Sequence, residues 1–435
     1  MNKIGVVVCN FNGEKYIIGC LDAVFNSDIE EFDVYVVDNS STDNSVNLVI
    51  EKYGDKVNII RNSYNLGGSG GFGRGLRECV KLGYDYIALI DNDAFVDTNT
   101  IRTLYEYMLK DGECGIVGAK IMMLDKPQYI MDYAARLDFK TQWEGSDWNN
   151  TKEDDSSMEI RECDFVAATT ALVRKEAIIK SGGMDESNFI YFDDIDMSYR
   201  IHLAGYKNVS VGSCKSWHKS NLCNNVTNNF GKYYYTRNKW RFFAKFIDDS
   251  LVYEFENNLM EKTFGSLYGS FRKGRLDLFQ TYNNIFMDFI NDKRGKAEEG
   301  VIIQYMSEQQ PKLREILDSK KNIYIKENDF DSRKVIDRLQ KYIDYNSLDI
   351  KIIKEWDNPD EIKESECDMS FIACKHVKDI SENILPAVYI DEYLNLVSSQ
   401  EDFYYFSSYK EQLFLFKQMF SNRLHNTVCK IREER

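Results

Sequence analysis

The chain has 435 residues, of which 43% are hydrophobic and 29% charged, and this composition is typical of folded globular domains. The length exceeds that of one ordinary hydrophobic core, which predicts two or three domains. A formal net charge of −15 excludes the large basic surface that neutralises nucleic-acid phosphates, so we expect no nucleic-acid partner.

The N-terminus reads MNKIGVVVCNFNG, and its apolar run is too short for the hydrophobic region of a signal peptide. No stretch has the length and hydrophobicity needed to span a bilayer. Ten cysteines occur without a C-x-x-C pair, which favours reduced, buried thiols over disulfides or a zinc site. These features predict a cytoplasmic protein, soluble or peripheral to a membrane.

Strands and helices alternate at short intervals from the N-terminus. Strands are expected at 3–9, 33–37 and 57–61, and helices at 14–26 and 43–52, the second with Asp43 as its N-cap. This alternation predicts an α/β domain with a doubly wound, mostly parallel sheet.

A glycine-rich run follows the third strand. Six of the nine residues from Gly67 to Gly75 are glycine, and a helix is expected to begin within or just after the run and to continue to Leu82. Free backbone N–H groups at such a helix start suit the approach of a phosphate. The run is neither a Walker A loop nor a dinucleotide fingerprint, and a tight strand–helix packing turn is the alternative interpretation.

The next strand, YIALI, ends in Asp91-Asn92-Asp93. Two carboxylates at the end of a buried strand are costly unless a cation meets them. The carboxyl ends of parallel strands are also where open α/β sheets bind ligands, and a D-x-D there can hold a hard divalent cation. The alternative is that Asp91 caps the following helix while Asp93 is solvated.

Further elements lead to a second acidic centre. We expect helices at 98–110 and 174–181, strands at 115–119 and 164–173, and a mobile polar excursion at 140–159. Asp193-Asp194-Ile195-Asp196 follows an aromatic run, at the expected start of a helix whose positive end favours ionised carboxylates. One carboxylate could be a general base, whereas for Asp196 helix-end charge alone is the preferred interpretation. A strand at 207–211 then leads to Trp217 and His218, and a basic-aromatic helix is expected at 231–246.

The motifs NSSTDNS, NLGGSGGFGRG, IDNDAF, FIYFDDIDMSYRIHLAGY, WHK and YYYTRNK occur in that order. In that order they resemble glycosyltransferase family 2, of the GT-A fold, over roughly residues 3 to 245. The NLGGSGG run, the D-x-D and the D-D-x-D with a downstream Trp-His are similar to those of bacterial galactofuranosyltransferases, with rhamnosyltransferases as close relatives.

The resemblance implies a role for each matching residue. Donor binding falls to Asp38, Asn65, Gly67, Gly68, Asp91, Asn92 and Arg237. The ligands of Mn²⁺ or Mg²⁺ are Asp91, Asp93 and His218. Asp194 matches the catalytic base, and Asp193 and Trp217 match the acceptor side. The implied reaction is an inverting displacement, in which Asp194 takes the proton of an acceptor hydroxyl that attacks the anomeric carbon of a nucleotide sugar.

Two departures from the galactofuranosyltransferase pattern bear on the acceptor. An aromatic pair expected before the base is replaced by small residues, Ala167-Ala168-Thr169, and no large β domain precedes the catalytic strand. These departures favour a single sugar addition over polymerisation. UDP-galactofuranose is the expected donor, dTDP-rhamnose is the alternative, and the acceptor is a glycan or a polyprenyl-linked glycan of the cell surface.

The remainder of the chain lies outside the resemblance. The expected domains are a catalytic domain at 1–245, a helical connection at 246–319 and a small α/β domain at 320–435. The last segment places Leu413, Phe416, Phe420 and Leu424 at helical spacing among basic residues. This amphipathic helix could lie peripherally on the inner face of the plasma membrane, or dock against protein, including a second copy of the chain.

Two other classes of function compete with the glycosyltransferase. A non-catalytic, nucleotide-binding scaffold could keep the same fold, but it has no need of Asp91, Asp93, Asp194 and His218 together. A nucleotidyltransferase would use a similar acidic pair, but it would not need the later Asp-Asp and Trp-His.

Overall fold

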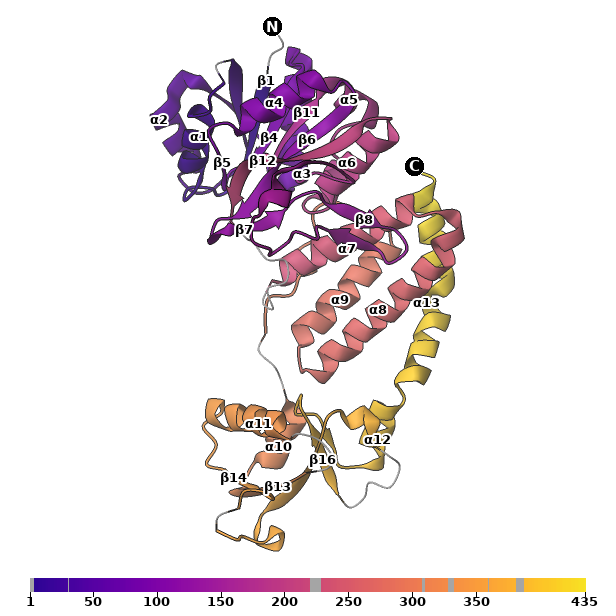
Figure 1. The fold of residues 1–435 in the computed structure, drawn as a ribbon. Helices are drawn as coiled ribbons and strands as arrows, with labels where there is room; N and C mark the ends of the chain where they lie inside the picture. The colour runs from indigo at the N-terminus through magenta and orange to yellow at the C-terminus, as the bar shows by residue number, and fades with distance from the viewer. Residues whose placement is uncertain are drawn as a thin grey trace. The chain divides into compact units, whose positions relative to one another are not determined.

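The computed structural model describes residues 4–29, 31–219, 228–306, 310–327, 332–358, 360–380 and 387–435 (Figure 1). Lys3, where the first strand was expected to begin, lies outside these residues. The chain divides into two compact units. Unit 1 comprises residues 1–255, 288–299 and 428–435, and unit 2 comprises residues 256–287 and 300–427.

Unit 1 is built on one mixed sheet, with the strand order β10-β12-β6-β11-β4-β1-β2-β3. The three N-terminal strands and β4 pair in parallel, β12 pairs in parallel with β6, and β11 is antiparallel between β4 and β6. The strand bounds are β1 Ile4–Asn10, β2 Phe32–Asp38, β3 Val57–Arg61, β4 Tyr86–Asp91, β6 Cys114–Met123, β10 Ile160–Cys163, β11 Thr170–Arg174 and β12 Lys207–His218. Off this path, β5 (Ala94–Val96) pairs with β12 and β7 (Lys126–Asp132) pairs with β6.

Helices cover both faces of this sheet. One core lies under α1 (Ile17–Phe25), α2 (Ser45–Tyr53) and α4 (Thr100–Lys110). The other lies under α3 (Gly67–Leu82), α5 (Lys175–Ser181) and α6 (Asp193–Leu203). Because apolar side chains alternate between the faces of each strand, Val6 and Val8 point into the first core and Val7 into the second. The predicted α/β, doubly wound, mostly parallel architecture is confirmed.

The glycine-rich run lies inside a helix, not before one. Gly67 is the first residue of α3 and has φ +74°, a left-handed conformation in which glycine is favoured. Gly75 packs against β1, where a Cβ would lie 2.3 Å from Val7 Cγ1. The alternative of tight strand–helix packing is therefore correct for the second half of the run, and it does not exclude a ligand at the first half.

Two expectations for the middle of the chain are wrong. The strand expected at 164–173 is only β11, Thr170–Arg174, because the segment before it leaves the sheet after β10. The polar segment 140–159 packs onto the sheet through polar contacts, including the ion pair between Glu153 and Lys120. It contains β9 (Trp143–Gly145), which pairs with β8 (Arg136–Asp138), and a 3₁₀ turn at Asp155–Met158.

The helix α7 (Asn229–Phe246) packs its aromatic residues within unit 1, and the helices that follow are divided between the two units. Their bounds are α8 Val252–Arg272, α9 Leu276–Ile290, α10 Pro311–Leu317, α11 Arg333–Tyr345, α12 Gln400–Ser407 and α13 Tyr409–Arg432. No helix among the described residues combines the length and the hydropathy that a membrane crossing requires. Each cysteine in the described ranges is a free thiol.

Unit 2 contains a second, smaller sheet in the order β14-β13-β15-β16-β17. The first four strands are parallel, and β17 is antiparallel to β16. The bounds are β13 Asn322–Glu327, β14 Lys351–Lys354, β15 Met369–Cys374, β16 Val388–Asp391 and β17 Leu396–Val397. A small α/β domain was expected here, and its sheet is confirmed, whereas the division of the chain into three consecutive domains stays a prediction.

The apolar stripe of α13 packs against protein within unit 2. The Phe416 ring lies 5.6 Å from that of Phe264 and 5.2 Å from that of Phe286, and Leu424 is fully buried. This packing agrees with the docking interpretation of the helix. Contact with a membrane surface stays a prediction.

Candidate active site

Polar side chains gather where three neighbouring parallel strands end. Asn10, Asp38 and Asp91 close β1, β2 and β4, and the register pairs Asn10 with Asp38 and Cys9 with Asp91. Asn10 Nδ2 donates to Asp38 Oδ1 at 3.2 Å, and Asn92 Nδ2 donates to Asn10 Oδ1 at 2.9 Å. The sequence therefore brings the expected donor-binding residues Asp38, Asp91 and Asn92 to one edge of the sheet, where Asn10 joins Asp38 to Asn92.

Asp91, Asp93 and His218 form a cluster at this edge, with ligand atoms that all lie within 4.8 Å of one another. His218 Nε2 lies 3.0 Å from Asp93 Oδ1 and 3.7 Å from Asp91 Oδ2. The cluster is brought together because β12 ends at His218, which pairs with Ala94 of β5 directly after the D-x-D. It is the one such cluster of three among the residues that the structure describes.

The chemistry of this cluster fits a divalent metal ion. Two carboxylate oxygens and one imidazole nitrogen are ligands that Mn²⁺ accepts, and Mg²⁺ accepts the carboxylates. Burial and the neighbouring Asp93 charge raise the pKa of Asp91 to about 6, although His218 opposes this rise. Burial alone would lower the pKa of His218, but the hydrogen bond to Asp93 and the two carboxylate charges raise it. A cation bound between Asp91 and Asp93 would reduce the repulsion between their negative charges, which contributes to the raised pKa of Asp91.

The start of α3 lies beside the second strand end. Asn65 Oδ1 accepts a hydrogen bond from Gly67 N at 2.7 Å, and the Gly67 carbonyl accepts one from Asn39 Nδ2 at 2.8 Å. A Cβ at Gly68 would lie 3.9 Å from Asp193 Oδ2, so the glycine run faces the second acidic centre. Asn65, Gly67 and Gly68, all expected on the donor side, thus lie in a turn that contacts Asn39 after β2 and faces the second acidic centre.

The second acidic centre begins α6. Ser69 Oγ donates to Asp193 Oδ2 at 2.8 Å, and the backbone N–H groups of Ala168 and Ile195 donate to Asp194. Burial and the adjacent Asp193 charge raise the pKa of the Asp194 carboxyl, and burial raises that of Asp193. A carboxyl group with a raised pKa is a better proton acceptor at neutral pH than an ordinary aspartate. Asp196, in contrast, is buried and pairs with Arg200 at 2.5 Å, so it has an ion-pair partner besides the helix-end charge expected of it.

The turn that delivers these carboxylates has a strained backbone. Phe189, Tyr191 and Phe192 have φ of +66°, +66° and +64°, which bulky residues rarely adopt. Asn238 Nδ2 donates to the carbonyls of Asn188, Ile190 and Tyr191 at 2.9–3.0 Å and so holds the turn from α7. Strain of this kind persists only where the surroundings enforce it, and it is concentrated at functional sites.

Arg237 is engaged within the protein. Its side chain is 3% exposed, Nη2 donates to the Gly295 carbonyl at 2.9 Å, and the guanidinium lies over the rings of Tyr233 and Tyr234. Nη2 also donates to the Asn188 carbonyl at 3.4 Å, so Arg237 contacts the segment that leads into the strained turn. Its expected contact with a donor phosphate stays a prediction, and the contacts in this structure are those of a residue that supports the turn.

Trp217 precedes the metal-ligating histidine on β12. Its Nε1 donates to the Pro127 carbonyl at 3.4 Å, and its ring packs beside the cluster of Met122, Ile130 and Tyr133. The side chain is partly exposed. The expected acceptor contact of Trp217 therefore stays a prediction, with part of its surface free to make it.

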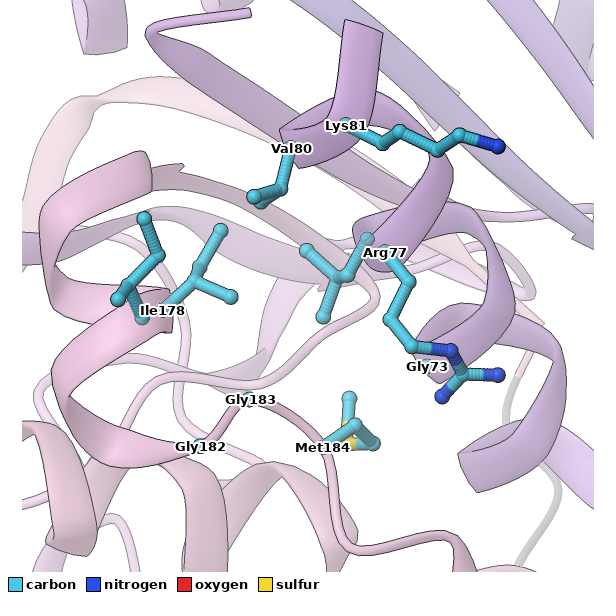
Figure 2. A pocket seen from close by; sticks show the side chains of 10 residues that line it. Gly73, Arg77, Val80, Lys81, Ile178, Gly182, Gly183 and Met184 are labelled. Atoms are coloured by element: carbon cyan, nitrogen blue, oxygen red, sulfur yellow. The ribbon is translucent and has the colours of Figure 1, made fainter. Parts of the chain in front are cut away.

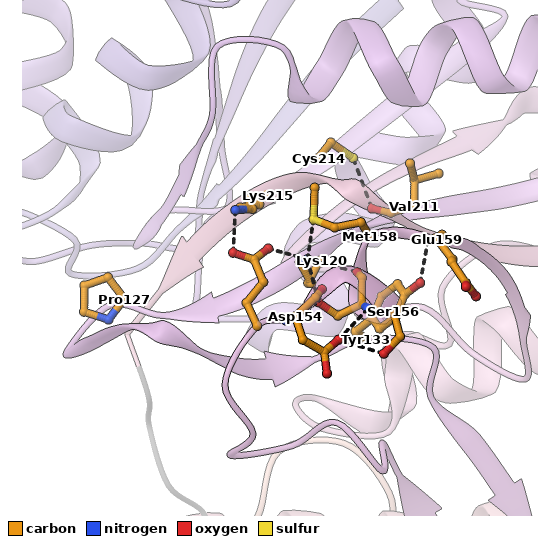
Figure 3. A network of polar contacts seen from close by, with 12 residues as sticks. Lys120, Pro127, Tyr133, Asp154, Ser156, Met158, Glu159, Val211, Cys214 and Lys215 are labelled. Carbon is orange, nitrogen blue, oxygen red and sulfur yellow. Dashed lines mark hydrogen bonds and ion pairs between the residues drawn. The ribbon is translucent and has the colours of Figure 1, made fainter.

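A buried network fixes the strands that lead to this edge (Figure 3). Lys120 on β6 has no exposed side-chain surface; its Nζ lies 2.5 Å from Glu153 and donates to the Ser157 carbonyl at 3.0 Å. Glu153 also pairs with Lys215 at 2.6 Å, and Lys215 is the register partner of Lys120. Since His218 lies three residues after Lys215, the network holds the end of β12 in register with β6.

A separate cavity of about 460 Å³ lies between α3 and α5 (Figure 2). It is lined by the side chains of Leu76, Val80, Ile178 and Met184, with Arg77 and Lys81 among its residues. No residue of the two acidic centres lines it, so it is distinct from the candidate site.

Several residues of the candidate site and of the contacts that support it were not predicted from the sequence: Asn10, Asn39, Ser69, Lys120, Glu153 and Asn238. Ser69 stands inside the glycine run and Asn238 follows Arg237, so their places in motifs were the available signal. Their partners are distant along the chain and could not be read from spacing.

Residues 5–181 match the family model described as Glycosyl transferase family 2. An uncharacterized glycosyltransferase of Haemophilus influenzae is 28% identical over 134 residues, which is 27% of this chain and 41% of that protein. The poly(ribitol-phosphate) beta-N-acetylglucosaminyltransferase TarS of Staphylococcus aureus is 33% identical over 105 residues, 23% of this chain and 18% of TarS. The matches thus span less than half of either relative.

Among solved structures, that of S. aureus TarS residues 1–349 has a TM-score of 0.43 and 16% sequence identity. The alignment covers 67% of this chain and 79% of that one.

Proposed function

We propose, from the premise that residues 5–181 form a glycosyl transferase family 2 domain, that this chain is a metal-dependent, inverting glycosyltransferase. It moves a sugar from a nucleoside-diphosphate donor to a hydroxyl of a cell-surface glycan or polyprenyl-linked acceptor. The observation that carries the proposal is the meeting of two acidic centres, 100 residues apart in sequence, at the carboxyl edge of one sheet. One supplies a ligand set for a cation, and the other a carboxyl group with a raised pKa.

The donor is held between the D-x-D edge and the start of α3. Asp38 and Asn92, linked through Asn10, would receive the nucleoside, and the N-terminal turn of α3 would receive the diphosphate. Mn²⁺ or Mg²⁺ held by Asp91, Asp93 and His218 would offset the charge of the departing nucleoside diphosphate.

The acceptor hydroxyl is activated by Asp194. Its Oδ1 accepts from the backbone N–H of Ile195 at 2.8 Å and its Oδ2 from that of Ala168 at 3.3 Å, so two fixed donors orient the carboxylate. Asp194 takes the hydroxyl proton while the oxygen attacks the anomeric carbon from the side opposite the leaving diphosphate. A single displacement of this kind inverts the anomeric configuration.

The donor sugar is proposed as galactofuranose from UDP-galactofuranose, on the motif resemblance, with rhamnose from dTDP-rhamnose as the second candidate. Named relatives act on poly(ribitol-phosphate) with N-acetylglucosamine and glucose, which adds UDP-N-acetylglucosamine and UDP-glucose to the donors worth testing. The poly(ribitol-phosphate) in the names of these relatives also supports a phosphate-containing cell-wall polymer as an acceptor.

The test is donor turnover across these four nucleotide sugars, with Mn²⁺, with Mg²⁺ and with chelator, read as released nucleoside diphosphate. Metal-dependent release from one donor supports the proposal and names the sugar. Release that is unchanged by chelator overturns the metal site. No release and no nucleotide binding across the panel overturns the enzyme and favours the scaffold interpretation.

A further inference from the structure

The strands of the sheet in unit 2 reverse their sequence order at one point across the sheet, and the proposed function does not use this point. β14 lies on one side of β13 and β15 on the other, and these strands run parallel with β16. The connections therefore diverge between β13 and β15. In open α/β sheets, ligands bind outside the carboxyl ends of the strands at such a point.

Three cations surround one aromatic ring beyond this edge. Tyr393 follows β16 by two residues, and its ring centroid lies 5.0 Å from Arg272 Cζ, 5.4 Å from Lys273 Nζ and 5.1 Å from Arg338 Cζ. The cations come from the end of α8 and from α11, while the ring of His376, which follows β15, stacks on Tyr393 at 6.0 Å. An aromatic ring commonly attracts one cation, so three at one ring is a convergence of like charges.

The carboxylates nearby are already engaged with other cations. Asp391 pairs with Arg272 at 3.3 Å and also accepts the backbone N–H groups of Tyr393 and Asn395. Glu392 lies 3.9 Å from Lys334 Nζ. Within the described residues, Arg272 and Lys334 are paired with Asp391 and Glu392, whereas neither Lys273 nor Arg338 has a carboxylate partner.

Two groups beside the ring, the buried Arg272 and the partly buried His376, record the excess positive charge. Arg272 is 8% exposed, and its Nε, which is buried, has no hydrogen-bond acceptor in the described part of the chain. Burial and the charge of Arg272 lower the pKa of His376, so the neutral imidazole is favoured beside the guanidinium. A buried donor without an acceptor costs free energy comparable to a lost hydrogen bond.

We propose that this carboxyl edge of unit 2 binds a small phosphate-bearing ligand, with Lys273 and Arg338 as its principal cations and Tyr393 as the surface on which they converge. A phosphate dianion carries the two negative charges that these two side chains lack. The planar guanidinium of Arg338 suits two phosphate oxygens at once, and Lys273 acts as a point charge. A metal ion is disfavoured by the same cations.

This site is independent of the proposed glycosyl transfer. Its residues belong to the second sheet and its helices, and none of Asp91, Asp93, Asp194 or His218 takes part. A ligand here would give residues 320 onward a binding role.

The test is calorimetric titration of the full-length chain with inorganic phosphate. The titration is carried out in the presence of a metal chelator and at constant ionic strength. We expect saturable binding that weakens at least tenfold in the double variant Lys273→Gln/Arg338→Gln. The matched control Lys341→Gln/Lys410→Gln removes two exposed lysines that have no contact with the ring and is expected to bind as the unaltered chain does. Circular dichroism of both double variants verifies that they are folded.

Three outcomes would overturn the proposal. They are the absence of saturable phosphate binding, equal binding by the Lys273→Gln/Arg338→Gln variant, and an equal loss in the control variant. Phosphatidylglycerol vesicles are titrated in parallel. Binding of vesicles without binding of phosphate would assign the cations to a lipid surface and would also overturn it.

Discussion

Ser69 donates a hydrogen bond to Asp193 at 2.8 Å across 124 positions of sequence. One residue lies in the first turn of the glycine-rich helix α3, and the other begins α6. The bond fixes the distance between the part of the chain proposed to hold the donor diphosphate and the carboxylates proposed to activate the acceptor. In a displacement reaction this distance matters, because the attacking oxygen and the anomeric carbon must be held close together and in line.

The base assignment is tested by Asp194→Asn. The amide keeps the size of the side chain but cannot accept the acceptor proton, so we expect kcat to fall by about 10²–10⁴-fold, the usual contribution of a general base. Binding of the nucleotide sugar, measured by calorimetry with Mn²⁺, is expected to change little.

Asp196→Asn serves as the comparison. It removes the buried ion pair with Arg200 and is expected to lower the melting temperature while the folded fraction keeps its kcat. Retained transfer by Asp194→Asn would show that another carboxylate is the base.

The pH dependence of transfer follows from the environment of Asp194. Burial and the Asp193 charge raise the pKa of Asp194, and only the ionised form accepts a proton, so kcat falls as pH is lowered through that raised pKa. The acid limb of the curve of kcat against pH is therefore expected well above pH 4, where an ordinary aspartate ionises. Asp193→Asn removes one of the causes and is expected to move the limb to lower pH. A limb that stays in place in this variant would contradict the coupling.

The metal site is tested without any sugar present. His218→Ala removes one of three ligands, and we expect the affinity for Mn²⁺ to fall at least about tenfold in an electron paramagnetic resonance titration. His202→Ala is the matched control, because His202 is exposed on α6 and does not belong to the metal-binding cluster found among the described residues. Equal affinity of both variants would remove His218 from the ligand set.

The sequence predicted the parts of the site that depend on strand order. Asp38 and Asp91 follow the apolar runs of two parallel strands, β2 and β4, that flank β1, and strands of one direction end at one edge. The pairing of His218 with the D-x-D came from the family resemblance, since β12 is separated from β4 by more than 100 residues. Spacing could not show that Asn238 holds a turn 47–50 positions away, because that contact depends on how α7 packs.

The same limit explains the error over residues 140–159. Their composition is polar and acidic, and composition alone indicates a solvated segment. Lys120 reverses this conclusion, because a fully buried ammonium on β6 needs a carboxylate, and Glu153 supplies it from the polar segment. A charged residue in the middle of an apolar strand was the available signal for that contact.

The last prediction concerns this buried pair. Glu153→Gln leaves Lys120 and Lys215 without their shared carboxylate, and breaking a buried ion pair on one side costs about 3–5 kcal/mol. Glu159→Gln is the control, since its pair with Arg161 is exposed and contributes about 0–1 kcal/mol. Burial opposes ionisation of Glu153, but the two lysines outweigh it and lower its pKa. The stabilisation is therefore present above the unfolded glutamate pKa and is lost as pH falls towards the lower folded value. We expect the melting temperature of Glu153→Gln to lie well below that of Glu159→Gln at pH 7, and the difference to narrow in acid. Equal melting temperatures at pH 7 would mean that the pair does not hold β12 against β6, and that the strand pairing of β12 with β5 and β6 positions His218 without it.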